Sequence, residues 1–332
     1  MMRRTVVRML LVLSAIFLIF GTATFLIAKD HFLRPGPLQT SMTIIIERGG
    51  GVGKIAAYLK DAGVIENAVL FRLGVRYEGL ASKLKAGEYV FPAHASMRSV
   101  AAIIASGKTV KRRLTIAEGL LAVQIKKIVL AVPGLTGEVP ESYWQDGTLL
   151  PETYFYSYGD SRLSVIKRMQ EQLKKVLSRT WAQRSTSVQL KSPEEALILA
   201  SIIEKETGKA SERAHISGVF HNRLRRRMPL QSDPTVVYGV TNGKRVLNRP
   251  LTKADLRTPS PYNTYLNNGL PPAPIANAGL AAIRAAVMPI TTTDLYFVAD
   301  GKGGHAFART HREHNRNVAK WRKIQRKVRD RK

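Results

Sequence analysis

A continuous apolar segment near the N-terminus constrains this chain more than any other feature. Residues Met9 to Ala28 (MLLVLSAIFLIFGTATFLIA) carry no charge, and only Ser14, Thr22 and Thr24 are polar. At about 1.5 Å per residue, a helix of this length crosses the hydrocarbon core of a bilayer. The run is too long for the apolar part of a secretory signal, and no small-residue cleavage site follows it. We therefore predict an uncleaved, single-pass transmembrane helix.

The charges that flank this segment predict its orientation. Arg3, Arg4 and Arg8 precede it, whereas Lys29 and Arg34 follow it. Positive charge concentrates on the cytoplasmic side of membrane helices. The expected location is the cytoplasmic (inner) membrane, with a cytoplasmic N-terminus (residues 1–8) and the bulk of the chain on the extracytoplasmic side.

Composition limits the chemistry that the rest of the chain can perform. The 332 residues include no cysteine, which excludes thiolate catalysis and cysteine-ligated metal sites. The formal net charge of +28 raises nucleic acid as a partner. An extracytoplasmic location opposes nucleic acid and favours anionic lipid headgroups and wall polymers instead. We interpret the basic C-terminus (WRKIQRKVRDRK) as a solvated charged surface.

Changes in pattern divide the chain after the anchor. Residues 29–41 contain the Pro- and Gly-bearing stretch RPGPLQT and are predicted to be a linker. Residues 42–95 read as a small β-α-α-β unit, with strands at Met42–Glu47 and Gly87–Phe91 around two short helices. Residues 96–332 form a larger mixed domain with a basic C-terminal tail. The fold class expected is α+β.

The clearest helix signal in the larger domain begins at Ser192. Ser192 is the expected N-cap, Pro193 occupies the first helical position, and Glu195 follows three residues after the cap. The next residues, ALILASII, are apolar on all sides, which predicts a buried central helix. Farther along, residues 229–274 are rich in Pro, Asn, Thr and Tyr and are predicted to be mostly loops and short strands.

Two carboxylates appear at the end of this central helix. Glu204 and Glu206 are two positions apart, hence about 200° apart around the helix axis, and cannot share one face. A glutamate half-buried at the end of an apolar helix can have a pKa raised enough to donate a proton. A Glu-Lys-Glu pattern is also common on solvated helix surfaces. Spacing alone does not choose between these interpretations.

Several blocks follow one another in the larger domain: QDGTLLPETY, ASIIEKET, ASER, VFHNRL, LQSDPTVVYG, YNTY, GLPP and LYFVADGKGGHAF. These ordered blocks resemble the YceG-like family, whose members are endolytic murein transglycosylases. The upstream segment MTIIIERGGGVGKIAAYLKDAGVI resembles the small LysM-like subdomain of the family. The resemblance implies a transmembrane anchor, a LysM-like subdomain at 42–95 and a catalytic domain at 96–332.

The resemblance selects Glu206 as the catalytic residue, with Thr207 beside it and Glu204 in a supporting or solvated role. The implied reaction cleaves the bond from N-acetylmuramic acid to N-acetylglucosamine in nascent glycan strands and leaves a 1,6-anhydro end. One carboxyl group is enough for this reaction, because it first protonates the leaving oxygen and then accepts the proton of the C6 hydroxyl. A hydrolase commonly needs two carboxyl groups.

The loop blocks supply candidate substrate contacts, because amides, carboxylates and tyrosine rings suit a glycan groove. The candidates are Gln231, Asp233, Tyr238, Tyr262 and Asn263. Each also suits ordinary turn or core structure. Asp233 could instead act as a second carboxylate, which would make the enzyme a hydrolase.

Neither a metal nor a cofactor is expected. His305, His311 and His314 lie near acidic residues, but HREH is not a zinc-binding HExxH motif. The resemblance also implies no cofactor. GKGGH lacks a phosphate-loop pattern and is predicted to be a hairpin turn.

The expected partners are peptidoglycan glycan strands and the cytoplasmic membrane, and the resemblance further implies association with cell-wall synthases. The alternative to an enzyme is a binding protein, namely a membrane-anchored, non-catalytic scaffold that binds peptidoglycan. A second alternative is a basic nucleic-acid-binding protein, which would require the bulk of the chain to face the cytoplasm.

Overall fold

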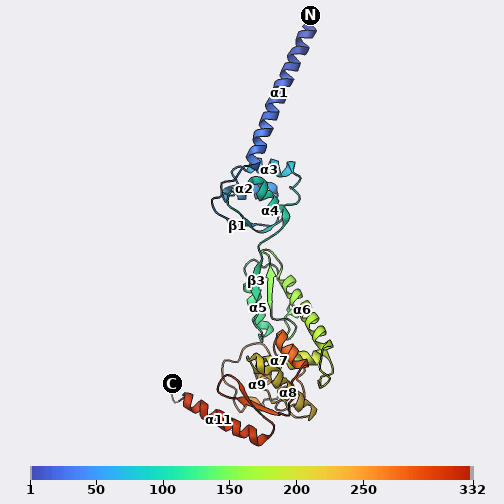
Figure 1. Cartoon of the computed structure of the whole chain (residues 1–332), viewed down its shortest axis with the longest axis vertical. Coiled ribbons are helices and arrows are strands. Elements are labelled where there is room, and N and C mark those ends of the chain that lie inside the picture. The colour runs from blue at the N-terminus through green and yellow to red at the C-terminus, as the bar shows by residue number, and fades with distance from the viewer. Residues whose placement is uncertain (1, 330–332) are drawn as a thin grey trace. The chain divides into compact units, whose positions relative to one another are not determined.

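The computed structural model describes residues 2–329, and its contacts divide the chain into two compact units (Figure 1). The first unit runs to Arg112 and also includes Phe155–Asp160, whereas the second holds Arg113–Tyr154 and continues from Ser161. Helices and short antiparallel strands occur in both units, which confirms the predicted α+β class.

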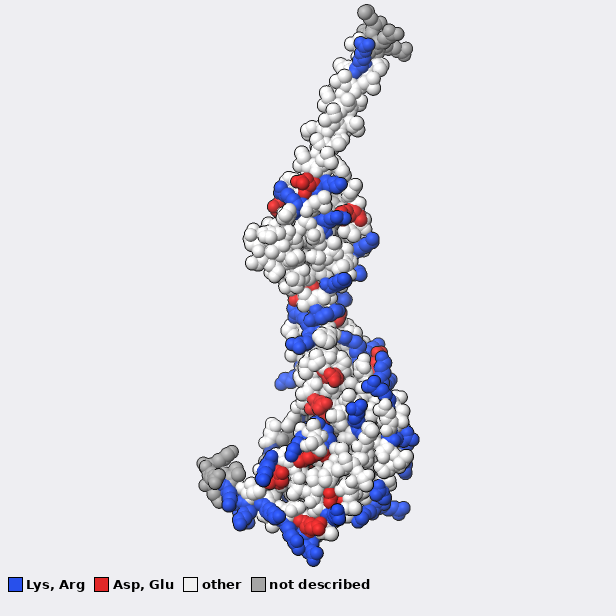
Figure 2. Space-filling model, viewed as in Figure 1, with Lys and Arg blue, Asp and Glu red and all other residues white. Residues whose placement is uncertain are grey.

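The predicted transmembrane segment lies within one long helix. Helix α1 spans Met2–Leu33, and its Thr5–Leu33 part is long and apolar enough to cross a membrane. Residues 9–28 of this helix carry no charge, and Figure 2 shows most of its length without charged side chains. Its large apolar side chains are exposed, so they have no protein core of their own. These properties support the predicted membrane anchor.

The first unit has the predicted β-α-α-β order. Strand β1 (Met42–Ile46) pairs antiparallel with β2 (Gly87–Phe91), so that Met42 faces Phe91 and Ile46 faces Gly87. Three helices complete the unit: α2 (Val52–Asp61), α3 (Ala68–Tyr77) and α4 (Met97–Ser106).

Two boundaries of the first unit differ from the sequence-based expectation. Residues 29–41 were predicted to be a linker, but α1 continues to Leu33, and Phe32 and Leu38 are each only 5% exposed within the core of the unit. Helix α4 was predicted to belong to the larger domain, but Val100 and Ile104 are buried in the same core. Apolar residues in a Pro-containing segment thus pack rather than remain in solvent.

The second unit is built around α7 (Pro193–Glu206), the predicted central helix. Ser192 caps it by accepting a hydrogen bond from the Glu195 N–H at 3.3 Å, as expected for its first turn. The middle of α7 is buried on all sides against neighbouring helices. These neighbours are α6 (Arg162–Ala182), α8 (Arg213–Arg225), α9 (Asp233–Thr241) and α10 (Leu280–Val287).

The region from Pro229 to Pro274 contains one helix that the sequence did not predict. Helix α9 begins with Asp233-Pro234 and packs on α7. Its β-branched residues have low helix propensity, but burial of Thr235 and Val236 stabilises the helical conformation. The rest of residues 229–274 is irregular apart from a short 3-10 turn, so the predicted loops are confirmed and the predicted short strands are wrong.

The remaining elements border this helical core. Strands β5 (Tyr296–Ala299) and β6 (His305–Ala308) form a hairpin, and its GKGGH segment makes the predicted turn, with Gly301 and Gly303 at positive φ. Helix α11 (His311–Arg329) follows the hairpin and packs against both strands. The other elements are β3 (Arg112–Thr115), paired with β4 (Thr153–Tyr156), α5 (Ala122–Ala131), and the 3-10 turns Glu141–Tyr143, Ala210–Glu212 and Asp255–Arg257.

Candidate active site

Helix α7 directs its two terminal glutamates into different surroundings. The Glu204 side chain is 5% exposed, and its Oε2 accepts a hydrogen bond from the Gly279 N–H at 3.0 Å. Its Oε1 lies 3.5 Å from the Arg213 guanidinium. Glu206 instead accepts a hydrogen bond from the Ser232 hydroxyl, at 2.5 Å. The different partners follow from the helical spacing, and Glu204 is held by the protein rather than by solvent.

Glu206 has the electrostatic environment of a general acid. The pKa of Glu206 is raised to about 7, mainly by burial and also by the nearby negative charge of Asp233. The Ser232 hydrogen bond and the positive charge of Arg223 act in the opposite direction. A carboxyl group with this pKa is partly protonated near neutral pH, which suits both donation and acceptance of a proton.

Two cavities meet at Glu206. The first, of about 420 Å³, is lined on one side by Gln231, Asp233 and Tyr265 and on the other by the β5–β6 hairpin. The second, of about 730 Å³, lies between the end of α7, the turn of the same hairpin and Trp321 of α11. Glu206 and His305 line both cavities. A ligand that occupied both would therefore pass over Glu206.

A buried arginine shapes the first cavity. Arg223 is 6% exposed, and its guanidinium donates hydrogen bonds to the carbonyl oxygens of Leu295 at 2.7 Å and Leu230 at 2.8 Å. It thus joins the hairpin to the loop that carries Gln231 and Ser232. The same guanidinium lies 3.4 Å from Gln231 Oε1, and Gln231 has a positive φ of 49°.

The loop that follows α9 contributes a tyrosine to the first cavity. The Tyr265 hydroxyl donates a hydrogen bond to Asp233 Oδ1 at 2.6 Å. Asp233 is exposed, so this contact fixes its carboxylate at the cavity wall without removing it from solvent. The predicted residues Gln231 and Asp233 are therefore brought together with Glu206.

His305, which lines the second cavity, is paired with Glu212. His305 Nδ1 lies 2.7 Å from Glu212 Oε2, and the His305 main-chain N–H donates to Glu212 Oε1 at 3.1 Å. Burial alone would raise the pKa of Glu212, but the hydrogen bonds from His305 and Lys209 hold it below its ordinary value. Glu212 is therefore ionised at neutral pH and fixes the orientation of the His305 ring. Thr207 also lines this cavity and accepts a hydrogen bond from the Lys209 N–H at 3.0 Å.

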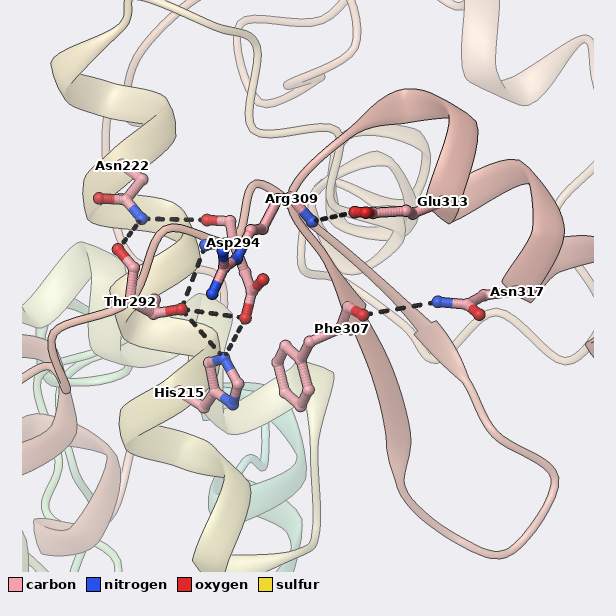
Figure 3. A network of polar contacts seen from close by, with 8 residues as sticks. All are labelled: His215, Asn222, Thr292, Asp294, Phe307, Arg309, Glu313 and Asn317. Carbon is pink, nitrogen blue, oxygen red and sulfur yellow. Dashed lines mark hydrogen bonds and ion pairs between the residues drawn. The ribbon is translucent and has the colours of Figure 1, made fainter.

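The base of the hairpin is held to α8 by a compact polar network (Figure 3). His215 Nε2 lies 2.8 Å from Asp294 Oδ2, and the Asn222 side-chain amide donates to the carbonyl oxygen of Thr292 at 2.8 Å. The Phe307 ring stacks on His215 with 3.5 Å between ring centroids. This network fixes the strands that supply His305, so both cavities have a rigid wall.

Three of the predicted contact residues lie outside the two cavities at Glu206. Tyr238 donates a hydrogen bond to Asp146 Oδ2 at 2.9 Å and lines a separate cavity of about 500 Å³. The Tyr262 ring packs on Tyr238 with centroids 4.7 Å apart. Asn263 is 1% exposed, and its amide donates to main-chain carbonyl oxygens of its own loop. The contact of these three with substrate stays a prediction.

Sequence reasoning missed several residues of the site, and all but Trp321 lie in the blocks that it singled out. They are Glu212, Arg223, Ser232, Tyr265, Tyr296 and Trp321, whereas His305 was considered only as a metal ligand. Ser232 stands between Gln231 and Asp233, and Arg223 belongs to VFHNRL. Only the motif blocks themselves could have pointed to these residues, because their partners are distant in the sequence.

The three C-terminal histidines all line the first cavity. His305 pairs with Glu212, whereas the rings of His311 and His314 lie 6.5 Å from each other and 5.9 Å and 5.2 Å from that of Tyr296. Within residues 2–329, no three His, Asp or Glu side chains are grouped as metal ligands. That the protein uses no metal stays a prediction.

Comparison with known proteins extends the resemblance to most of the chain. The model of the YceG-like family matches residues 44–320. A Bacillus subtilis protein named endolytic murein transglycosylase is 35% identical over 315 residues, which cover 85% of each protein. A Streptococcus pneumoniae protein of the same name is 31% identical over 324 residues, which cover 84% of this chain and 58% of that protein.

A solved structure agrees with these relatives. The crystal structure of a YceG-like protein from Listeria monocytogenes has a TM-score of 0.51 and 30% sequence identity to this chain. The match covers 84% of this chain and 99% of that one. Because the family match includes both the first unit and the helix that carries Glu206, this chain belongs to the YceG-like family.

Proposed function

We propose that this protein is an endolytic peptidoglycan lytic transglycosylase in which Glu206 is the only acid–base catalyst. The observation that carries the proposal is a carboxyl group with a pKa raised to about 7 where two cavities meet. The relatives from B. subtilis and S. pneumoniae are named for this activity. The substrate is then a glycan strand, and the bond cleaved is the one from N-acetylmuramic acid to N-acetylglucosamine within it.

The proposed reaction consists of two proton transfers at one carboxyl group. Protonated Glu206 gives its proton to the glycosidic oxygen as the bond to the anomeric carbon breaks. The C6 hydroxyl oxygen of the same muramic acid then bonds to that carbon, and its proton passes to Glu206. The products are a new N-acetylglucosamine 4-hydroxyl end and a 1,6-anhydro end. Glu206 regains its starting state, and no water is consumed.

The surrounding groups have defined tasks in this reaction. Ser232 holds one oxygen of Glu206, so the other carboxyl oxygen is available to the substrate. Gln231 and Asp233 are the predicted contacts that the geometry favours, because they line the cavity beside Glu206. Thr207 and Glu204 support the end of α7 from its two sides. No cofactor takes part in the proposed steps.

The pH dependence of the reaction reports the state of Glu206. The acid form must be present at the start, so kcat/KM is expected to fall as the pH rises through about 7. Since the Ser232 hydrogen bond lowers the pKa of Glu206, Ser232→Ala should move this limb to higher pH. Ser232→Thr keeps a hydroxyl and serves as control. An unchanged limb in Ser232→Ala would contradict the assignment.

Substrate contacts can be separated by their effects on KM. We expect Gln231→Ala to raise KM by about tenfold, because the binding free energy of one hydrogen bond to a polar ligand corresponds to a change of about this size. Tyr238→Phe removes only the hydroxyl that donates to Asp146, in a different cavity, and should raise KM less than Gln231→Ala does. Steady-state kinetics on uncrosslinked glycan strands measure both. A rise in KM for Tyr238→Phe alone would place the substrate in the other cavity.

One product assay distinguishes the proposed function from its alternatives. The full chain in detergent is incubated with uncrosslinked glycan strands, and the fragments are examined by mass spectrometry. Internal fragments with anhydro ends are expected. Reducing ends would indicate a hydrolase in which Asp233 is a second carboxylate, and binding without cleavage would indicate a non-catalytic scaffold.

The proposal extends to location and partners. The charges around α1 favour an extracytoplasmic second unit, which would meet nascent strands close to the cytoplasmic membrane and to cell-wall synthases. Reporter fusions at the C-terminus test this orientation. A cytoplasmic C-terminus would instead favour nucleic acid as the partner of the basic surface, which Figure 2 shows on the second unit and along α11.

A further inference from the structure

Helix α3 of the first unit has an exposed apolar face. Val69, Leu73 and Tyr77 are 55%, 54% and 74% exposed, and their four-residue spacing places them on one side of the helix. The opposite side carries Phe71 and Val75, which are fully buried in the core of the unit. A strip of three large apolar side chains at this spacing indicates a surface that a partner covers.

This face borders the membrane helix. Phe32 of α1 packs directly on Gly74 of α3, where a Cβ atom would come within 2.4 Å of its ring. The ring of Phe25 lies edge-on to that of Tyr77, with centroids 5.6 Å apart. Figure 1 shows α3 at the end of the first unit from which α1 emerges. Both helices belong to the same compact unit, so the position of α3 relative to α1 is fixed.

The contact with Phe25 sets the depth of α3 relative to a bilayer. Phe25 lies inside the uncharged run that ends at Ala28, about 4.5 Å along the helix from that end. If α1 crosses a bilayer, Tyr77 must lie at the level of the last apolar turn, in the interfacial layer. Tyrosine is enriched at this level, since its ring is apolar and its hydroxyl reaches water.

The charges around the face complete the match to a lipid surface. Arg72 and Arg76 are exposed on α3 beside the apolar residues, and cationic side chains there attract anionic headgroups. The nearby acidic residues Glu66 and Glu78 are paired with Arg34 at 2.6 Å and with Arg98 at 2.8 Å. An apolar strip flanked by arginines is the pattern of a helix that lies along a membrane surface.

We propose that α3 lies in the interfacial layer of the leaflet from which α1 emerges, with Val69, Leu73 and Tyr77 inserted among the lipids. The first unit is then docked on the membrane by two elements and does not move freely on a tether. The proposal requires that α1 spans a bilayer and is independent of the reaction proposed for Glu206.

The absence of cysteine makes a direct test possible. The full chain with Leu73→Cys is labelled with a nitroxide and reconstituted in vesicles of phosphatidylethanolamine and phosphatidylglycerol. Collision rates with oxygen, which concentrates in lipid, and with a water-soluble nickel complex are then measured. Phe17→Cys, 81% exposed within α1, is the lipid control, and Val90→Cys, 48% exposed on β2, is the aqueous control.

We expect the label at position 73 to collide more often with oxygen than with nickel, as at position 17 and unlike at position 90. A label at 73 that behaves like the one at 90, while the one at 17 reports lipid, would overturn the proposal. If the label at position 17 also reports water, α1 does not span the bilayer. The proposal, which requires that span, is then wrong. Neither result would bear on the cleavage of glycan strands.

Discussion

Glu206→Gln is expected to lower kcat by about 10³-fold, in the range that positioned acid–base groups contribute. The amide cannot donate the acidic proton to the glycosidic oxygen or accept one from the C6 hydroxyl. It keeps the size of the glutamate and an oxygen that can accept from Ser232, so the fold and substrate binding should be retained. The measurement is the rate of anhydro-end formation from glycan strands, together with the melting temperature of the variant.

Glu204→Gln is the matched control for this prediction, since it makes the same change two residues earlier on α7. Glu204 is bound by Gly279 and Arg213 and lines neither cavity at Glu206. We therefore expect activity close to that of the unaltered protein and a modest loss of stability. An inactive Glu204→Gln beside a fully active Glu206→Gln would reverse the assignment of the catalytic residue.

Arg223→Ala is expected to reduce the free energy of unfolding by about 3 kcal/mol, because it leaves buried carbonyl oxygens without donors. The guanidinium donates to the main chain at Leu230 and Leu295, which belong to different segments of the wall around the first cavity. Its loss should also lower activity, because the segment with Leu230 carries Gln231 and Ser232. Thermal unfolding and the glycan assay measure the two effects.

Two variants serve as controls for Arg223→Ala. Arg226→Ala removes an exposed arginine at the end of the same helix and should change the unfolding free energy by less than about 0.5 kcal/mol. Arg223→Lys keeps the charge but not the forked geometry, so an intermediate loss is expected. If Arg223→Ala were as stable as Arg226→Ala, the buried hydrogen bonds would not hold the cavity wall.

Local patterns predicted the main elements of the chain well. The uncharged run from Met9 to Ala28 has the length of a membrane helix, and Ser192-Pro193 followed by apolar residues marks the start of α7. These signals are reliable because caps, helix periods and apolar runs depend on residues close together in the sequence. Helix α9 escaped prediction, since its stability comes from packing on α7 and not from its own residues.

The site was predictable only in part. The spacing of Glu204 and Glu206 showed that they face different ways, but it did not show which one lines a cavity. Ser232 contacts Glu206 from 26 positions farther along the chain, and His305 contacts Glu212 across 93 positions. No local pattern encodes such pairs.

The sequence by itself determined the long apolar N-terminal helix, the α+β class, the central helix and, through its motif blocks, the family. Only the tertiary structure decided that Glu206 is the glutamate at the cavities, that Arg223 and Ser232 lie beside it, and that Phe32 and Leu38 pack into the first unit. The physical reason is that helix formation depends on neighbours in sequence, whereas burial and pKa depend on which distant segments the fold brings together.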